Sequence, residues 1–296
     1  MSAVEPTLSL QGNRRVRRRR IVNMLAEATA TIAALAAIFV LGAVVWAIAK
    51  RGGSELSWGF LTSDLPLPFS NQSGGIAPLI VGSAVLVGIA TAIALPTGVA
   101  IAIFLEEFAS NAVRAPIQLA IDLLNGLPSV IIGVFVFGLL VYGHPQNGWA
   151  GGIGLSIVML PLVTRATQEV LSLVPATQRE GALALGASRW RTVLGITLPS
   201  AAGGILTGTV LAIARAAGET APLLFVTSIY GRAIDLNPAH ALPNLPVQIF
   251  IWSESPDPED HKRAWASALV LLVFVLVTSL IARVFLERNR RKLGNR

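Results

Sequence analysis

Long apolar stretches, each bounded by polar or charged residues, recur along this chain. They cover residues 28–49, 76–105, 117–142, 149–170, 201–228 and 264–285. About 20 consecutive apolar residues let an α-helix cross a hydrocarbon core about 30 Å thick. The second and fifth stretches are longer, so those helices are expected to tilt or kink. The pattern predicts an all-α, polytopic membrane protein with six transmembrane helices.

Composition supports this prediction and narrows the chemistry. Of the 296 residues, 53% are hydrophobic and only 13% charged, and the mean hydropathy is +0.67. A soluble domain has about a quarter charged residues. The absence of cysteine excludes disulfides and thiolate sites. His144, His240 and His261 lie far apart and form no H-E-x-x-H motif. We therefore expect no metal, no cofactor and no catalytic residue.

Positive charge gathers at the two ends of the chain, which carries a net charge of +7. The basic residues concerned are Arg14, Arg15, Arg17, Arg18, Arg19, Arg20, Arg283, Arg288, Arg290, Arg291, Lys292 and Arg296. Basic clusters beside membrane spans mark the cytoplasmic side. We interpret this charge as a signal of topology in a lipid bilayer rather than of nucleic-acid binding. With both termini in the cytoplasm, the inside segments hold a clear excess of Lys and Arg.

Two charged residues interrupt the apolar stretch 201–228. Arg215 and Glu219 are four positions apart, so on a helix they share one face. An ionised arginine at the bilayer centre costs about 2.5–3.5 kcal/mol on insertion scales and therefore faces a bundle interior or a water-filled path. A guanidinium is a planar fork of donors that suits phosphate oxygens. The pair is either part of a substrate pathway or a permanent ion pair between spans.

The polar segment 171–199 predicts two short helices joined at a glycine. Thr177 and Glu180 have the spacing of a capping box, which predicts a helix beginning directly after Thr177. Gly186 fits the left-handed position that ends a helix, and Ser188 can cap the next one. Physically, this elbow is either a docking element or a hairpin at the membrane surface.

The same segment resembles a known motif. Its residues Glu180-Gly181-Ala182, Gly186 and Ile196-Thr197-Leu198-Pro199 match the E-A-A-x(3)-G-x(9)-I-x-L-P loop of ABC importer permeases. Glycine 181 stands where that family usually has alanine, a change that lowers helix propensity by about 1 kcal/mol. The resemblance implies the type I ABC importer permease fold. It also implies a loop that couples to an ATPase through Glu180, Gly181, Ala182, Gly186, Arg189, Trp190, Ile196 and Pro199.

Two further segments, 212–224 and 125–133, are similar to the PstA-type permeases of phosphate importers. The resemblance covers about residues 72–286. It implies a heterodimer with a PstC-like permease, two copies of a PstB-like ATP-binding subunit, and an external phosphate-binding protein. It also supports Arg215 and Glu219 as pathway residues. The chain has no P-loop motif, so ATP hydrolysis is expected in the partner and not in this chain.

Together these features predict the organisation of the chain. A basic tail (1–27) precedes the first transmembrane helix (28–49) and an external loop (50–75). A permease core (76–286) contains the cytoplasmic coupling loop 171–199, and a basic tail follows (287–296). Two alternatives stay open. One is a permease for another oxyanion, such as molybdate or sulfate. The other is a secondary transporter, which would often show an inverted repeat; we find no convincing repeat.

Overall fold

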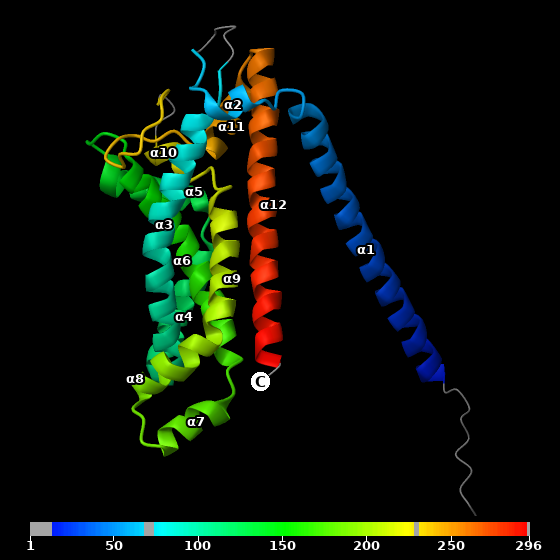
Figure 1. Cartoon of the computed structure of the whole chain (residues 1–296). Helices are drawn as coiled ribbons and strands as arrows, with labels where there is room; N and C mark the ends of the chain where they lie inside the picture. The colour runs from blue at the N-terminus through cyan, green and yellow to red at the C-terminus, as the bar shows by residue number, and fades with distance from the viewer. Residues whose placement is uncertain (1–13, 68–73, 228–230, 295–296) are drawn as a thin grey trace, which may run out of the picture. The chain divides into compact units, whose positions relative to one another are not determined.

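The computed structural model describes residues 14–67, 74–227 and 231–294, and every regular element in these ranges is a helix (Figure 1). The chain divides into two compact parts, Met1–Lys50 and Arg51–Arg296. The prediction of an all-α fold is confirmed for the described residues.

The described residues of the first part belong to helix α1 (Arg14–Gly52). We predicted a tail up to residue 27, but the helix already begins at Arg14. Arginine is a good helix former, so the helix continues through the basic run before the apolar residues start. Within this part, large apolar side chains such as Phe39 and Trp46 are exposed, as expected of a helix that crosses lipid.

Four long helices build the second part: α3 (Ala77–Ile103), α6 (Gly148–Ser172), α9 (Leu198–Ala216) and α12 (Pro258–Gly294). α3 packs against α6, α6 against α9, and α9 against α12. The main core contains Leu86, Met159 and Val163, all almost fully buried. At its far end α3 continues into a π-helical turn, η1 (Phe104–Phe108).

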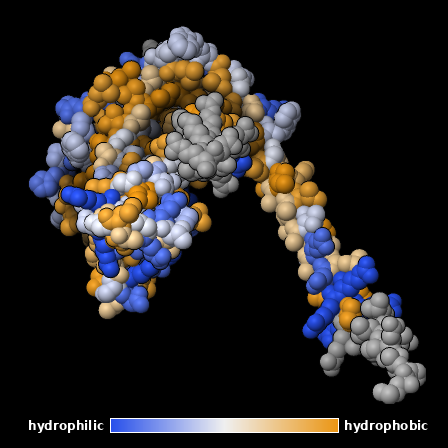
Figure 2. Space-filling view, turned by 60° about the horizontal axis from the view of Figure 1, so that its bottom comes forward, coloured by the Kyte–Doolittle hydropathy of each residue, from blue (hydrophilic) through white to orange (hydrophobic). Residues whose placement is uncertain are grey.

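Shorter helices lie at the two ends of this bundle. α2 (Trp58–Thr62) and α11 (Leu245–Glu254) lie at one end, and α7 (Ala176–Ala184) lies at the other (Figure 1). Figure 2 looks toward the α7 end, where hydrophilic residues gather, whereas the sides of the bundle are largely hydrophobic. This distribution is the one expected when the sides of the bundle face lipid.

By length and composition, five described helices can cross a membrane, and a bent pair of helices makes six if it counts as one span. The five are Val16–Gly52, Ala77–Phe108, Gly148–Ser172, Arg189–Ala216 and Pro258–Ile281, and the bent pair is Asn111–Gly126 with Ser129–Val141. The predicted number of six spans is confirmed when the bent pair counts as one span. Two of the six, however, differ from the continuous helices that we predicted.

The third span is broken rather than continuous. α4 (Asn111–Gly126) and α5 (Ser129–Val136), which continues into the π-helical η2 (Phe137–Val141), meet at an angle of 99°. The two residues between them, Leu127 and Pro128, are extended, with ψ of 134° and 129°. A proline disfavours helical geometry in the residue before it and has no N–H to donate. The sequence Gly126-Leu127-Pro128 therefore ends one helix and starts the next.

The fifth span is also shifted relative to the predicted 201–228. A continuous helix starts at Arg189 and runs through α8 (Arg189–Thr192), η3 (Val193–Thr197) and α9. It ends at Ala216, and after a turn the short α10 (Leu223–Val226) follows. Gly218 has low helix propensity, and Pro222 cannot continue the hydrogen-bond ladder. Ser228, the predicted end, lies outside the described residues.

Candidate functional site

Arg215 and Glu219 meet where α9 ends. Arg215 lies in the last turn of the helix, and Glu219 lies in the turn that follows it. The Nη2 atom of Arg215 is 3.4 Å from Oε1 of Glu219. The predicted proximity is correct, but the two residues do not sit in the middle of one helix, because the helix stops between them.

The ion pair is loose and unequally buried. The Arg215 side chain is 62% exposed, whereas that of Glu219 is 13% exposed. Among the described residues, the guanidinium makes this ionic contact and no hydrogen bond. Its planar fork of five N–H donors therefore has capacity for another acceptor.

A cavity of about 240 Å³ lies beside Arg215. Its walls come from the α4–α5 break, from α5 and α6, and from Arg215 itself: Leu124, Asn125, Leu127, Pro128, Ser129, Ile132, Val158, Leu162 and Arg215. The break and Arg215 are about 90 positions apart in the sequence, so only the fold brings them together. Arg215 is the one charged residue in this lining.

The polar groups of this cavity suit a small oxyanion. Arg215 brings a fixed positive charge and fork-shaped donors. Asn125 adds an amide and Ser129 a hydroxyl, both able to donate. α5 begins here without a side-chain cap, and the start of a helix carries unsatisfied N–H groups with partial positive charge. Apolar side chains of α6 complete the wall, which lowers the local dielectric and strengthens these interactions.

Sequence reasoning missed Asn125 and Ser129 as site residues. They belong to the segment 125–133, which we had used only for its resemblance. The available signal was the break itself, since polar residues on either side of Gly126-Leu127-Pro128 interrupt an apolar run.

The coupling loop has the predicted turn but a different start. α7 begins at Ala176, with Pro175 at the cap position and no side-chain cap. The capping box predicted at Thr177 and Glu180 is therefore wrong, because Thr177 is already inside the first turn. Gly186 has φ of +82°, as predicted for the end of the helix. The Ser188 hydroxyl accepts from the Arg191 amide at 3.4 Å, which confirms the second cap.

The remaining loop residues differ in exposure. Glu180 and Gly181 are exposed on α7, whereas Ala182 is buried. Arg189 and Trp190 are also exposed, and the Trp190 ring lies 5.7 Å from that of Phe108 at the end of α3. Ile196 is half-buried and Pro199 is exposed. Pro199 lies in the first turn of α9, which continues the helix that begins at Arg189.

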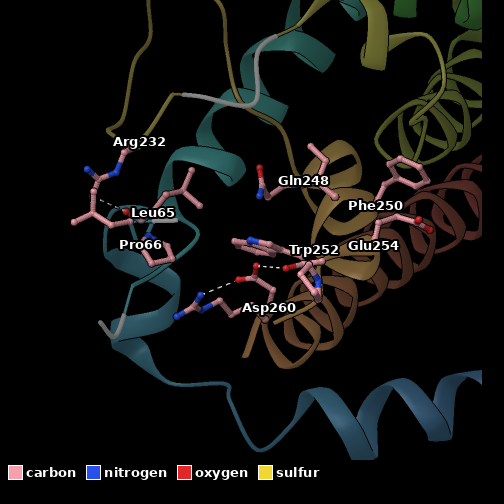
Figure 3. A pocket seen from close by; sticks show the side chains of 13 residues that line it. Leu65, Pro66, Arg232, Gln248, Phe250, Trp252, Glu254 and Asp260 are labelled. Carbon is pink, nitrogen blue, oxygen red and sulfur yellow. Dashed lines mark hydrogen bonds and ion pairs between the residues drawn. The ribbon is translucent and has the colours of Figure 1, made fainter. Parts of the chain in front are cut away.

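The opposite end of the bundle holds a larger cavity, of about 470 Å³ (Figure 3). Segments from both predicted external loops line it, and two hydrogen bonds between Leu65 and Arg232 hold them together. The Leu65 amide donates to the Arg232 carbonyl at 3.1 Å, and Arg232 Nη2 donates to the Leu65 carbonyl at 3.3 Å. Trp252 and Asp260 also line this cavity. The described parts of the two loops are therefore ordered against each other.

In the part of the chain that the structure describes, no group of three or more His, Asp or Glu side chains could hold a metal ion. Residues 94–293 match the family model described as binding-protein-dependent transport system inner membrane component. The chain belongs to this family. It is thus a multi-pass inner membrane component and not the ATP-hydrolysing subunit. The family's dependence on a binding protein implies that a binding protein and an ATPase are its partners.

Curated relatives of this inner membrane component match over nearly the whole chain. It is 37% identical over 274 residues to the phosphate transport system permease protein PstA of Yersinia pestis, covering 92% of each chain. It is 33% identical over 283 residues to the phosphate transport system permease protein PstA 1 of Mycobacterium tuberculosis (strain ATCC 25618 / H37Rv), covering 93% of this chain and 92% of that one.

Solved structures confirm the fold of the inner membrane component. A chain of a bacterial alginate ABC transporter, in complex with a periplasmic protein bound to alginate pentasaccharide, matches with a TM-score of 0.62. That match has 16% identity and covers 90% of this chain and 96% of that chain. A chain of the inward-facing MetNI methionine ABC transporter matches with a TM-score of 0.57 at 15% identity, covering 73% and 94%. The predicted ABC importer permease fold is thereby confirmed.

Proposed function

We propose that this chain is the permease subunit through which an ABC importer passes inorganic phosphate. Relatives named as phosphate permeases match more than nine-tenths of the chain. The structural observation that carries the proposal is the cavity beside the α4–α5 break, into which Arg215 brings a positive charge. Phosphate is an anion at neutral pH, and a low-dielectric passage repels it unless such a charge compensates.

In this proposal Arg215 is the charged contact for the phosphate, and Asn125 and Ser129 supply neutral hydrogen bonds. Glu219 holds Arg215 while the pathway is empty and releases it when the anion arrives. The alternative, a permanent structural pair, fits the geometry less well. A buried pair that ties spans together needs good hydrogen-bond geometry to offset its desolvation, whereas this pair is 3.4 Å apart and half of it is exposed.

The orientation of the chain follows from the same proposal. Both termini lie in the cytoplasm, on the same side as the coupling loop. Glu180, with Gly181, Ala182 and Gly186 and with the following Arg189, Trp190, Ile196 and Pro199, forms the docking element for the ATPase. Three large apolar side chains of this element, Leu183, Leu185 and Trp190, are exposed, which fits contact with a partner protein.

The partners complete the transporter. A PstC-like permease pairs with this chain, two PstB-like subunits bind and hydrolyse ATP on the cytoplasmic side, and a phosphate-binding protein delivers substrate from outside. The ordered loops around the 470 Å³ cavity are the surface that receives it.

The proposal is tested with the reconstituted transporter in vesicles. Arg215→Gln removes the charge and keeps an unbranched polar side chain, and Arg17→Gln on α1 is the control. We expect Arg215→Gln to assemble normally and to lower ATP-dependent phosphate uptake at least about tenfold, since the loss of a charge-assisted hydrogen bond costs about 1.5–3 kcal/mol. Arg17→Gln should retain uptake. Full uptake by an assembled Arg215→Gln transporter contradicts the pathway role.

A further inference from the structure

A cluster of charged and amide side chains joins four elements at the α7 end of the bundle. Its members are Glu106 and Glu107 on η1, Arg114 and Gln118 on α4, Gln168 on α6, and Arg179 on α7. Arg114 Nη2 lies 2.5 Å from Glu106 Oε1. The Gln168 amide donates to Gln118 Oε1 at 2.9 Å and to Glu106 Oε1 at 3.4 Å. The ends of α3, α4 and α6 are thus linked to one another.

Arg179 extends this cluster to the coupling helix. Its Nη2 atom is 3.0 Å from Oε1 of Glu107 and donates to the Leu171 carbonyl, near the end of α6, at 2.7 Å. The side chains of Glu107 and Arg179 are only 13% and 25% exposed. One side chain of α7 therefore contacts both α3, through η1, and α6. Ala182 is the buried residue of α7, and Arg179 is half-buried.

The contact between Glu107 and Arg179 is incompletely paired in this conformation. Oε1 of Glu107 lies 3.0 Å from Arg179 Nη2 but without hydrogen-bond geometry, and the buried Nε of Arg179 makes no hydrogen bond within the described structure. Buried polar atoms are normally hydrogen-bonded, so each exception needs a reason. A second position of α7, in which Glu107 and Arg179 form well-aligned hydrogen bonds, would account for this exception. Glu107 also lies in a π-helical turn, a geometry that is frequent at functional sites.

We propose that Glu107 and Arg179 transmit the movement of the coupling helix to the substrate cavity. This inference rests on the proposed function, because it takes α7 as the element that the ATPase moves. α6, whose end Arg179 holds, also supplies Val158 and Leu162 to the cavity wall beside Arg215. α3 packs along α6, so a displacement at Glu107 reaches the same helix. Rigid helices and ion pairs with two discrete arrangements are the kind of element that couples distant sites.

The first test compares ATP hydrolysis with phosphate uptake in the same vesicles. Glu107→Gln and Arg179→Gln remove one charge each, and Glu169→Gln is the matched control, an exposed carboxylate near the end of α6. We expect both variants to retain ATP hydrolysis within about twofold while uptake per ATP falls at least fivefold. The exchange Glu107→Arg with Arg179→Glu should restore part of that ratio. An unchanged ratio in both single variants overturns the inference, as does a parallel loss of both activities because the complex does not assemble.

A second readout does not depend on phosphate transport. The chain has no cysteine, so Leu124→Cys places a single thiol in the cavity wall. We expect ATP to change the rate at which a water-soluble maleimide labels this thiol, and Glu107→Gln or Arg179→Gln to abolish the change. A change that persists in both variants overturns the inference. Failure of the unaltered transporter to take up phosphate, with the labelling change intact, contradicts the proposed substrate and leaves the coupling role supported.

Discussion

Gly82 on α3 is the position where a single added carbon should destabilise the protein most clearly. A Cβ atom built there would lie 1.9 Å from the Pro243 carbonyl oxygen, a rigid backbone atom. The adjacent contacts leave little room for adjustment. The Leu245 amide donates to the Ser83 hydroxyl at 2.9 Å, and the buried Asn244 donates to Thr227 Oγ1 at 2.9 Å. Gly82→Ala must therefore separate α3 from the segment before α11.

The cost follows from these contacts. Overpacking a well-packed site costs about 1–3 kcal/mol, and leaving a buried polar group unpaired costs about 1–3 kcal/mol, so the total is about 2–6 kcal/mol. At about 2–4 °C per kcal/mol for a domain of 150–250 residues, Tm should fall by roughly 4–24 °C. The measurement is thermal unfolding of the purified chain in detergent.

Gly88 provides the control on the same helix. Nothing lies within 4 Å of a Cβ built at Gly88, and alanine favours a helix over glycine by about 1 kcal/mol. Gly88→Ala should therefore keep or raise Tm. Equal Tm values for Gly82→Ala and Gly88→Ala would refute the close approach of α3 and Pro243.

Three further predictions concern the pathway, the coupling loop and the outer loop. Arg215→Lys keeps the charge but loses the planar fork, so initial rates of phosphate uptake should fall less than in Arg215→Gln. An equal fall in both variants would contradict the role given to the positive charge. Glu180→Arg reverses an exposed charge on α7, so the ATPase should no longer co-purify while the chain still folds; normal co-purification contradicts a docking role. Hydrogen bonds from the Asn237 amide, at 2.8 Å, and from His240 hold the pKa of Asp235 below its usual range. The stabilisation is therefore present above the ordinary Asp pKa of about 3.9 and is lost as the pH falls through the lower folded value. The protection factor of the Asn237 amide, which is its exchange rate relative to the intrinsic rate at the same pH, should fall only in acid, and a fall near neutral pH refutes this.

The membrane spans and the coupling elbow could be predicted because each depends on a local signal. Apolar length identifies a span wherever its neighbours are polar. Gly186 and Ser188 act through their own backbone and hydroxyl, so their positions in the turn were correct. The predicted start of α7 was wrong, and the reason is also local. Pro175 occupies the cap position and the helix begins at Ala176. Thr177 therefore lies inside the first turn and does not cap the helix with Glu180.

The breaks in the third and fifth spans could not be found from hydropathy. Asn125 and Ser129 interrupt the apolar run only briefly, and an apolar length averaged over a whole span does not register the 99° bend between them. In the fifth span we expected a tilt or a kink, whereas the helix ends at Ala216, before Gly218 and Pro222. The cavity could not be predicted from the sequence for a different reason. Asn125, Ser129 and Arg215 come together only through the packing of α4, α5, α6 and α9.

The most direct test of the proposed function is the uptake of radiolabelled phosphate into vesicles that contain this chain and its partner subunits. It should be measured with and without the ATPase subunit, and against excess unlabelled phosphate, sulfate or molybdate. We predict uptake that requires the ATPase and ATP and that only unlabelled phosphate competes away. Uptake without the ATPase would indicate a secondary carrier, and equal competition by sulfate or molybdate would indicate another oxyanion; either result contradicts a phosphate-specific ABC permease.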